Sequence, residues 1–155
     1  MPNNYVQTSF TTPCTEEEFK IFQRLAAGVT GEELFNKDVD KLELLENLIG
    51  WTWEFEEDEL WIYMEEGALI DPMVDLLQEF LKKTNRDDAI KFTWSETCSK
   101  MHVDAFSGGG VFITKDGSSL LCVGSWLEEQ EKKHKNGTWV PDPMPNNKDK
   151  KEEAV

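Results

Sequence analysis

The chain has 155 residues, of which 31 are acidic and 16 are Lys or Arg, so its formal net charge is −15. This length fits a single domain that can bury a core, and an aromatic content of 11% argues against disorder. The charge argues against direct binding to nucleic acid or to anionic lipid, because both need clustered cations. We expect a cytoplasmic protein without a membrane span. The chain has an odd count of three cysteines, shows no signal-peptide pattern and has no apolar run near ~18 residues.

The first third of the chain predicts one strand followed by two helices. Residues 5–12 are rich in β-forming side chains. Thr15 and Glu18 have the spacing of a capping box, and apolar residues at helical spacing follow them. A second apolar stripe predicts a helix that begins at Glu32 or Asp38 and ends at Ile49.

Between residues 51 and 64 the apolar period changes from 3.6 to 2. Trp53 and Phe55 alternate with polar residues up to the Glu57–Asp58 pair, and the alternation resumes after it. This pattern predicts either two strands joined in a hairpin or one long strand with a bulge, and both interpretations stay open at this point.

The second half predicts a helix and then more strands. Asp71 and Pro72 indicate a helix start, since a proline in the first turn loses no hydrogen bond. Alternation and turn residues predict three further strands, over residues 90–95, 111–115 and 119–123. Asp116–Gly117 is typical of a hairpin turn. A short helix that reaches His134 follows.

Strands and helices do not alternate regularly enough for a parallel doubly wound sheet. We therefore predict an α+β fold, with an antiparallel sheet, helices packed on one of its faces, and a ferredoxin-like arrangement in part. Residues 1–135 form the predicted domain. Residues 136–155, where Pro, Lys and Glu dominate, form a predicted flexible tail.

The negative charge is concentrated in the middle of the chain. Residues 54–79 contain ten carboxylates and no Lys or Arg. An acidic surface attracts and steers a basic protein surface, although acidic faces also serve solubility alone. We predict that the partner-binding residues are Glu54, Glu56, Glu57, Asp58, Glu59, Trp61, Glu65 and Glu66. No stretch has the pattern of a calcium-binding loop, so we expect no metal.

A polar loop is the alternative location for chemistry. Its residue types suit a metal, a cysteine–histidine pair or a phosphate cradle, although none of the required patterns is complete. The residues of this alternative ligand loop are Cys98, Lys100, His102, Asp104, Ser107, Gly108 and Gly109. The interpretation without a binding or catalytic role is that the cysteine is a small apolar residue, the histidine lies on the surface, and the glycines form a bend where backbones come close.

The segment from Phe92 to Thr114, with Trp126–Leu127 downstream, carries a resemblance. Its W-S-x-x-C-S-K … D-x-F-x-G-G … F-I-T pattern resembles a family of small uncharacterised proteins of bacteria, phages and plasmids. Ser107 stands where the family's glycine run begins, and Gly110 takes a place usually filled by Ala. The resemblance implies a mobile-element origin and no known activity.

These observations together predict a non-enzymatic interaction protein of phage or mobile-element type. Its acidic face is expected to bind a basic protein surface, such as the groove of a nucleic-acid-binding enzyme, in the manner of inhibitors that mimic nucleic acid, anti-CRISPR proteins included. No cofactor is expected. The alternatives are a ligand, metal or catalytic site in the loop Cys98–Gly110, and a homodimer formed through the aromatic face of the sheet.

Overall fold

The structure is a computed structural model, and it describes residues 4–35, 43–101 and 105–143. It divides into two compact units, Met1–Gly124 and Ser125–Val155, which are described separately. Among the described residues, no helix is both long enough and apolar enough to cross a membrane.

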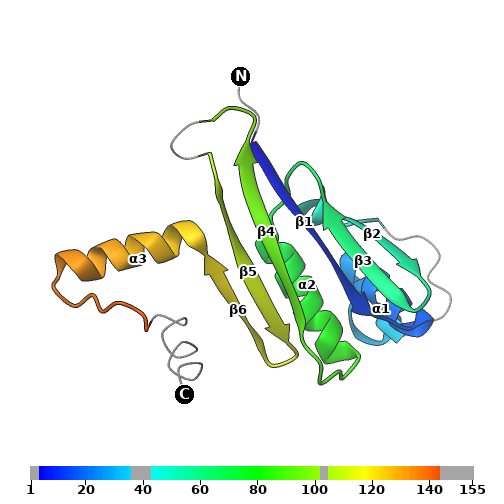
Figure 1. Ribbon diagram of the computed structural model, residues 1–155. Helices are drawn as coiled ribbons and strands as arrows, with labels where there is room; N and C mark the ends of the chain where they lie inside the picture. The colour runs from blue at the N-terminus through cyan, green and yellow to red at the C-terminus, as the bar shows by residue number, and fades with distance from the viewer. Residues whose placement is uncertain (1–3, 36–42, 102–104, 144–155) are drawn as a thin grey trace, which may run out of the picture. The chain divides into compact units, whose positions relative to one another are not determined.

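The first unit is built on a six-stranded antiparallel sheet (Figure 1). In spatial order from edge to edge the strands are β2, β3, β1, β4, β5 and β6. Their bounds are β1 Asn4–Pro13, β2 Thr52–Glu56, β3 Glu59–Met64, β4 Ile90–Cys98, β5 Ser107–Thr114 and β6 Gly117–Cys122. Two helices, α1 (Glu16–Ala26) and α2 (Ile70–Lys83), lie on one face of this sheet, and the opposite face carries no helix among the described residues of this unit (Figure 1).

The chain order β1-α1-β2-β3-α2-β4 and the spatial order β2-β3-β1-β4 together are those of a ferredoxin-like fold. The hairpin β5–β6 extends this core by pairing with β4. The predicted α+β class, with an antiparallel sheet and helices on one face, is therefore confirmed. Segment 51–64 is a hairpin with a two-residue turn, since Glu56 pairs with Glu59.

The core lies between the helices and the sheet. Helix α1 begins at the predicted capping box: Glu18 N–H donates to Thr15 Oγ1 over 3.1 Å, and Thr15 N–H donates to Glu18 Oε1 over 2.9 Å. The helix then packs its aromatic side chains on β2, with Phe19 stacked on Phe55 and Phe22 edge-on to Trp53. Fully buried side chains from both helices and from the sheet complete this core, among them Leu60, Ile62, Leu77, Phe80 and Ile113.

The predicted second helix is wrong over the described residues. The chain forms two short 3₁₀ turns instead, Gly31–Phe35 and Glu46–Leu48, and residues 36–42 lie outside the described part. Leu48 alone enters the core from the second turn, while Ile49 is exposed. The backbone N–H of Leu45 donates to the carbonyl of Ala26, so tertiary bonding replaced the helical pattern here.

The glycine run was expected in a loop, but it lies in β5. Trp94 and Gly109 are opposite each other on β4 and β5. A Cβ on Gly109 would lie 2.2 Å from the Trp94 ring and 2.1 Å from the carbonyl oxygen of Leu121. Only glycine leaves space for the indole at this position, so the run serves close packing of neighbouring strands.

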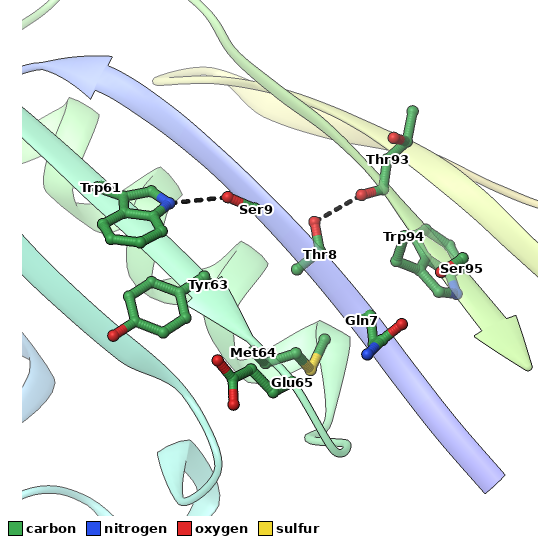
Figure 2. Close-up of a pocket in the computed structure, with 10 residues that line it drawn as sticks. All are labelled: Gln7, Thr8, Ser9, Trp61, Tyr63, Met64, Glu65, Thr93, Trp94 and Ser95. Atoms are coloured by element: carbon green, nitrogen blue, oxygen red, sulfur yellow. Dashed lines mark hydrogen bonds between the residues drawn. The ribbon is translucent and has the colours of Figure 1, made fainter.

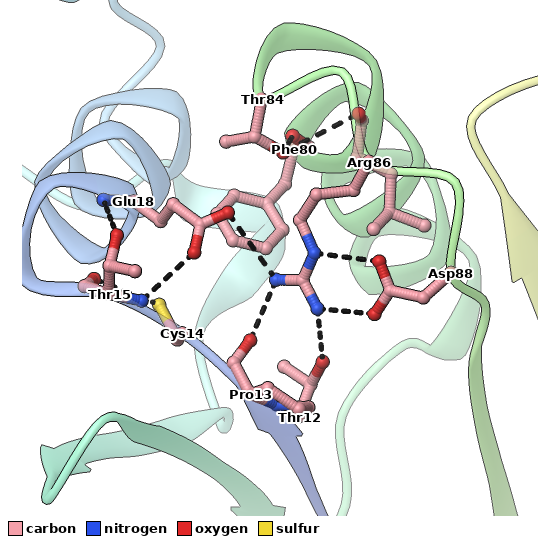
Figure 3. Close-up of polar contacts among 10 residues, drawn as sticks. Thr12, Pro13, Cys14, Thr15, Glu18, Phe80, Thr84, Arg86 and Asp88 are labelled. Carbon is pink, nitrogen blue, oxygen red and sulfur yellow. Dashed lines mark hydrogen bonds and ion pairs between the residues drawn. The ribbon is translucent and has the colours of Figure 1, made fainter.

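Arg86 ties together the ends of three elements (Figure 3). Its guanidinium donates to the carbonyl of Pro13 over 2.7 Å and to the carboxylate of Asp88, and it lies 3.8 Å from a Glu18 oxygen. It also sits 5.5 Å from the centre of the Phe80 ring. The end of β1, the start of α1 and the segment before β4 are thus held by one cation.

The second unit contains most of α3 (Val123–Lys135), the short helix predicted to reach His134. Within this unit Trp139 folds back on the helix, and its indole N–H donates to Gln130 Oε1 over 3.0 Å. Residues 144–155 of the predicted tail lie outside the described part.

Candidate protein-binding face

The helix-free face of the sheet carries the predicted acidic residues with the exception of Glu66, which is exposed in the bend after β3. Strand alternation turns Trp53 and Phe55 of β2 toward α1, so Glu54 and Glu56 point to the opposite side. The pairing register places Glu54 beside Trp61 and Glu56 beside Glu59. We call this surface the acidic face, and it consists of Glu54, Glu56, Glu57, Asp58, Glu59, Trp61, Tyr63 and Glu65.

Two aromatic rings stand at the centre of the acidic face. Trp61 and Tyr63 stack with their ring centres 4.2 Å apart. The Trp61 indole donates to Ser9 Oγ over 2.7 Å, which fixes the pair against β1 (Figure 2). Trp61 still exposes 40% of its surface. The rings are therefore held in place before any partner binds.

A shallow groove of about 480 Å³ runs beside these rings over β1 (Figure 2). Small and polar residues from β1 and β4 line it opposite Trp61 and Tyr63, namely Gln7, Ser9, Thr93 and Ser95. Glu65 lies at its acidic end. The groove is open enough for an extended side chain to lie along the aromatic pair.

The carboxylates around the rings are exposed and free of ion pairs. All seven predicted acidic residues are exposed, and among the described residues none of them forms an ion pair. Partial burial raises the pKa of Tyr63, and the charges of Glu54 and Glu65 raise it further. Strands β1, β2 and β3 contain no Lys or Arg. The field over this half of the sheet is therefore negative.

The tip of the hairpin departs from two local preferences that stabilise such turns. Glu56 and Glu59 are directly opposite each other, where like charges repel. Glu57 and Asp58 both have positive φ, 52° and 58°, in a two-residue turn that favours Asn-Gly. All four side chains are exposed, and among the described residues none of them forms an ion pair with a Lys or Arg. Such local conflicts concentrate at functional sites.

The alternative ligand loop is only partly described. Cys98 ends β4, Lys100 is exposed beyond it, and His102 and Asp104 lie outside the described residues. Ser107, Gly108 and Gly109 belong to β5 and pair with β4, so they form a strand and not a loop. Within the described residues no group of three or more His, Cys, Asp and Glu is placed to hold a metal ion.

Sequence reasoning missed the groove and left Tyr63 out of the predicted partner-binding residues. Ser9, Gln7 and Ser95 are unremarkable in sequence, and they meet the aromatic pair only because β1 lies between β3 and β4. Tyr63 lies two residues after Trp61 in the same strand, so strand alternation indicates that both side chains point to the same face.

Comparisons of this chain with protein-family models, with curated proteins and with solved structures found no match. The family resemblance of the segment from Phe92 to Thr114 therefore stays a prediction.

Proposed function

We propose that this protein binds another protein through the acidic face, and that its partner presents a basic surface. The observation that carries the proposal is the hairpin tip, where four carboxylates stand at unfavourable positions and form no ion pair with any described residue. A partner's Lys or Arg side chains would relieve the repulsion between Glu56 and Glu59, so binding would be favoured by the same charges that weaken the free hairpin.

The aromatic pair supplies the apolar part of such an interface. Tryptophan and tyrosine are the residues that most often dominate binding energy at protein interfaces. Trp61 is exposed and Tyr63 is half-buried, and the two rings are stacked and fixed by the bond to Ser9, so they lose little freedom on binding. An Arg or Lys stem lying in the groove would contact the rings and place its charge near Glu54 or Glu65.

The charge of this face argues for a protein partner over a nucleic acid. Some ferredoxin-like domains bind RNA through aromatic residues on the helix-free face of the sheet. Here carboxylates border the aromatic pair, and cations would be needed to neutralise phosphates. The finer proposal is that the partner is a basic, nucleic-acid-binding enzyme, which the chain inhibits by occupying its groove. That proposal fits the mobile-element origin which the resemblance implies.

Charge reversal on the acidic face, compared with equal reversal elsewhere, tests the proposal. Glu56→Lys, Glu57→Lys and Glu59→Lys in one variant should abolish capture of the basic partner from a host lysate at low salt. The control variant reverses Glu16, Glu17 and Asp75, which are exposed acidic residues of α1 and α2, and should retain capture. Wild-type capture should weaken strongly as salt is raised, since salt screens exposed charges.

A defined probe complements the lysate experiment. Immobilised wild-type protein should bind an arginine-rich peptide more tightly than the hairpin variant does, and Trp61→Ser should weaken that binding at unchanged net charge. Equal binding by the wild-type, hairpin and control proteins would show that the acidic face only solvates the molecule.

A further inference from the structure

The sheet ends in two edges of opposite character. Strand β2 forms one edge and carries Glu54 and Glu56. Strand β6 forms the other edge, and its sequence from Gly117 to Cys122 contains no charged residue and no proline. Charged side chains and proline are the usual means by which proteins prevent an edge strand from pairing with another chain. Edge β2 is protected in this way, and edge β6 is not.

Large apolar side chains are exposed at the unprotected edge. Leu120 and Leu121 expose 47% and 54% of their surfaces, and Phe112 on the neighbouring strand exposes 50%. Phe112 and Leu121 border an apolar hollow of about 630 Å³ on the helix-free face of the sheet. Within the described part of the chain, β6 pairs on one side only, with β5, so it presents a row of backbone groups and exposed leucines together, which are the two features that strand addition uses.

We propose that β6 pairs with β6 of a second copy of this chain, in antiparallel orientation about a two-fold axis. A second copy is the partner to which we commit, because the backbone N–H and C=O groups of an antiparallel edge strand are complementary to those of its own copy, and the charge distribution permits this contact. Two chains of net charge −15 repel each other, and contact through β6 brings together strands without charge. The sheet order separates β6 from the β2–β3 hairpin by three strands, so the acidic faces remain far apart.

The two-fold axis limits the register of this pairing. Residues opposite each other in an antiparallel pair point to the same face. One residue of the strand must therefore lie opposite its own copy, with the axis between the two. Placing it at Leu120 sets each Leu120 against its copy and sets Leu121 against Ser119 of the second copy. Because Ser119 is small and pairs with Phe112, the Leu121 side chain of one copy can then reach toward Phe112 of the other.

The oligomeric state of the full chain tests the proposal. Sedimentation equilibrium from about 5 to 500 µM should show a mass that rises from 17.9 kDa toward twice that value. Leu120→Lys should weaken the dimer at least tenfold, because it places two cations across the axis. Thr52→Lys adds the same charge to the opposite edge strand and should leave the dimer unchanged. Circular dichroism establishes that both variants are folded.

A cross-link then tests the register without depending on the lysine variant. In Leu120→Cys the two new thiols face each other, and diamide should join them, taking up the two electrons and two protons that the thiols release. Thr52→Cys and the wild type, which keep the same three native cysteines, should give no such dimer. A wild type that is monomeric at every concentration, or dimers lost in Thr52→Lys and kept in Leu120→Lys, would overturn the proposal.

Discussion

The β2–β3 hairpin and the β5–β6 hairpin are similar in build and opposite in chemistry. Each forms one end of the same sheet and each turns through two residues. The first carries exposed carboxylates that no cation among the described residues neutralises. The second holds a glycine run and an edge strand without charge. Their difference teaches that one sheet can separate charge from apolar surface, and it is the basis of the two proposals, a basic surface as partner at one end and an uncharged strand at the other.

The two hairpins also differ in how they accommodate neighbouring groups. At the β5 end, the backbone is shaped by close packing, since Gly109 leaves room for the Trp94 indole. At the β2–β3 end, charge is exposed at the expense of backbone and electrostatic stability. Substitutions should therefore destabilise the β5 end and stabilise the tip of the acidic hairpin.

The largest effect is expected at Gly109. Gly109→Ala should destabilise the protein by about 3 kcal/mol or more, because the new methyl group would overlap the Trp94 ring and the Leu121 carbonyl. Urea unfolding measures this loss. Gly110→Ala is the matched control, since its Cβ would lie no closer than 3.8 Å to its nearest neighbour, and it should change stability little. Equal losses at the two positions would contradict the packing role of Gly109.

Arg86 bonds to Asp88 and lies near Glu18, so these two acidic residues support the fold, in contrast to those of the acidic face. Arg86→Ala should cost about 2 kcal/mol at neutral pH, through loss of the bonds to the Pro13 carbonyl and to Asp88. Lys115→Ala removes an ion pair to the highly exposed Asp87 and should have little effect. Thermal unfolding of the two variants compares them.

The Arg86 effect should also depend on pH. The bond from Arg86 lowers the pKa of Asp88 in the folded protein below its ordinary value of 3.8. The associated stabilisation is thus present above pH 3.8 and is lost as the pH falls through the folded-state value. The difference between the wild type and Arg86→Ala should shrink in acid. A difference that is constant down to pH 2 would exclude this contribution of Asp88.

A smaller effect of opposite sign is expected at the tip of the acidic hairpin. The double variant Glu57→Asn, Asp58→Gly should stabilise the protein by about 1–2 kcal/mol, since Asn-Gly fits a turn with positive φ. The control, Glu54→Gln with Glu56→Gln, removes the same charge without changing the backbone preference. Chemical denaturation should show the greater gain in the turn variant. If the control gains as much, repulsion and not backbone strain is what weakens the tip.

The smallest effect is a shift in a titration. Glu54→Gln with Glu65→Gln should lower the pKa of Tyr63, because both carboxylates raise it in the wild type. Ultraviolet titration is suitable, since the chain has two tyrosines and Tyr5→Phe leaves one. Glu16→Gln with Glu17→Gln, on α1, should leave this pKa unchanged. Part of the elevation should persist in the first variant, because partial burial is its main cause.

Local signals predicted those elements whose stability is local. The Thr15–Glu18 capping box set the start of α1, and alternation around Trp53 and Phe55 set β2. The same kind of signal failed in segment 32–49, where leucines at helical spacing do not form a continuous helix. There the backbone of Gly50 lies close to the carbonyl of Gly67, and the spacing of apolar residues along the chain does not predict this contact.

Turn residues were equally instructive. Asp116–Gly117 predicted a turn, and the loop instead consists of Lys115 and Asp116, one residue earlier, with no positive φ at either. The turn that does use positive φ is Glu57–Asp58, which has no sequence signal for it. Pairing of the flanking strands therefore set both turns, because the register of a hairpin is decided by the side chains that must be buried.

The sequence by itself determined the α+β class, the concentration of carboxylates in residues 54–79 and the exposure of Glu54 and Glu56, since composition and periodicity are local properties. Only the tertiary structure decided which surface those carboxylates share. Placing β1 between β3 and β4 built the groove beside Trp61 and Tyr63, and adding β5–β6 beyond β4 left an uncharged strand at the far edge. Both outcomes depend on pairing between strands distant in sequence, which residue spacing along the chain does not encode.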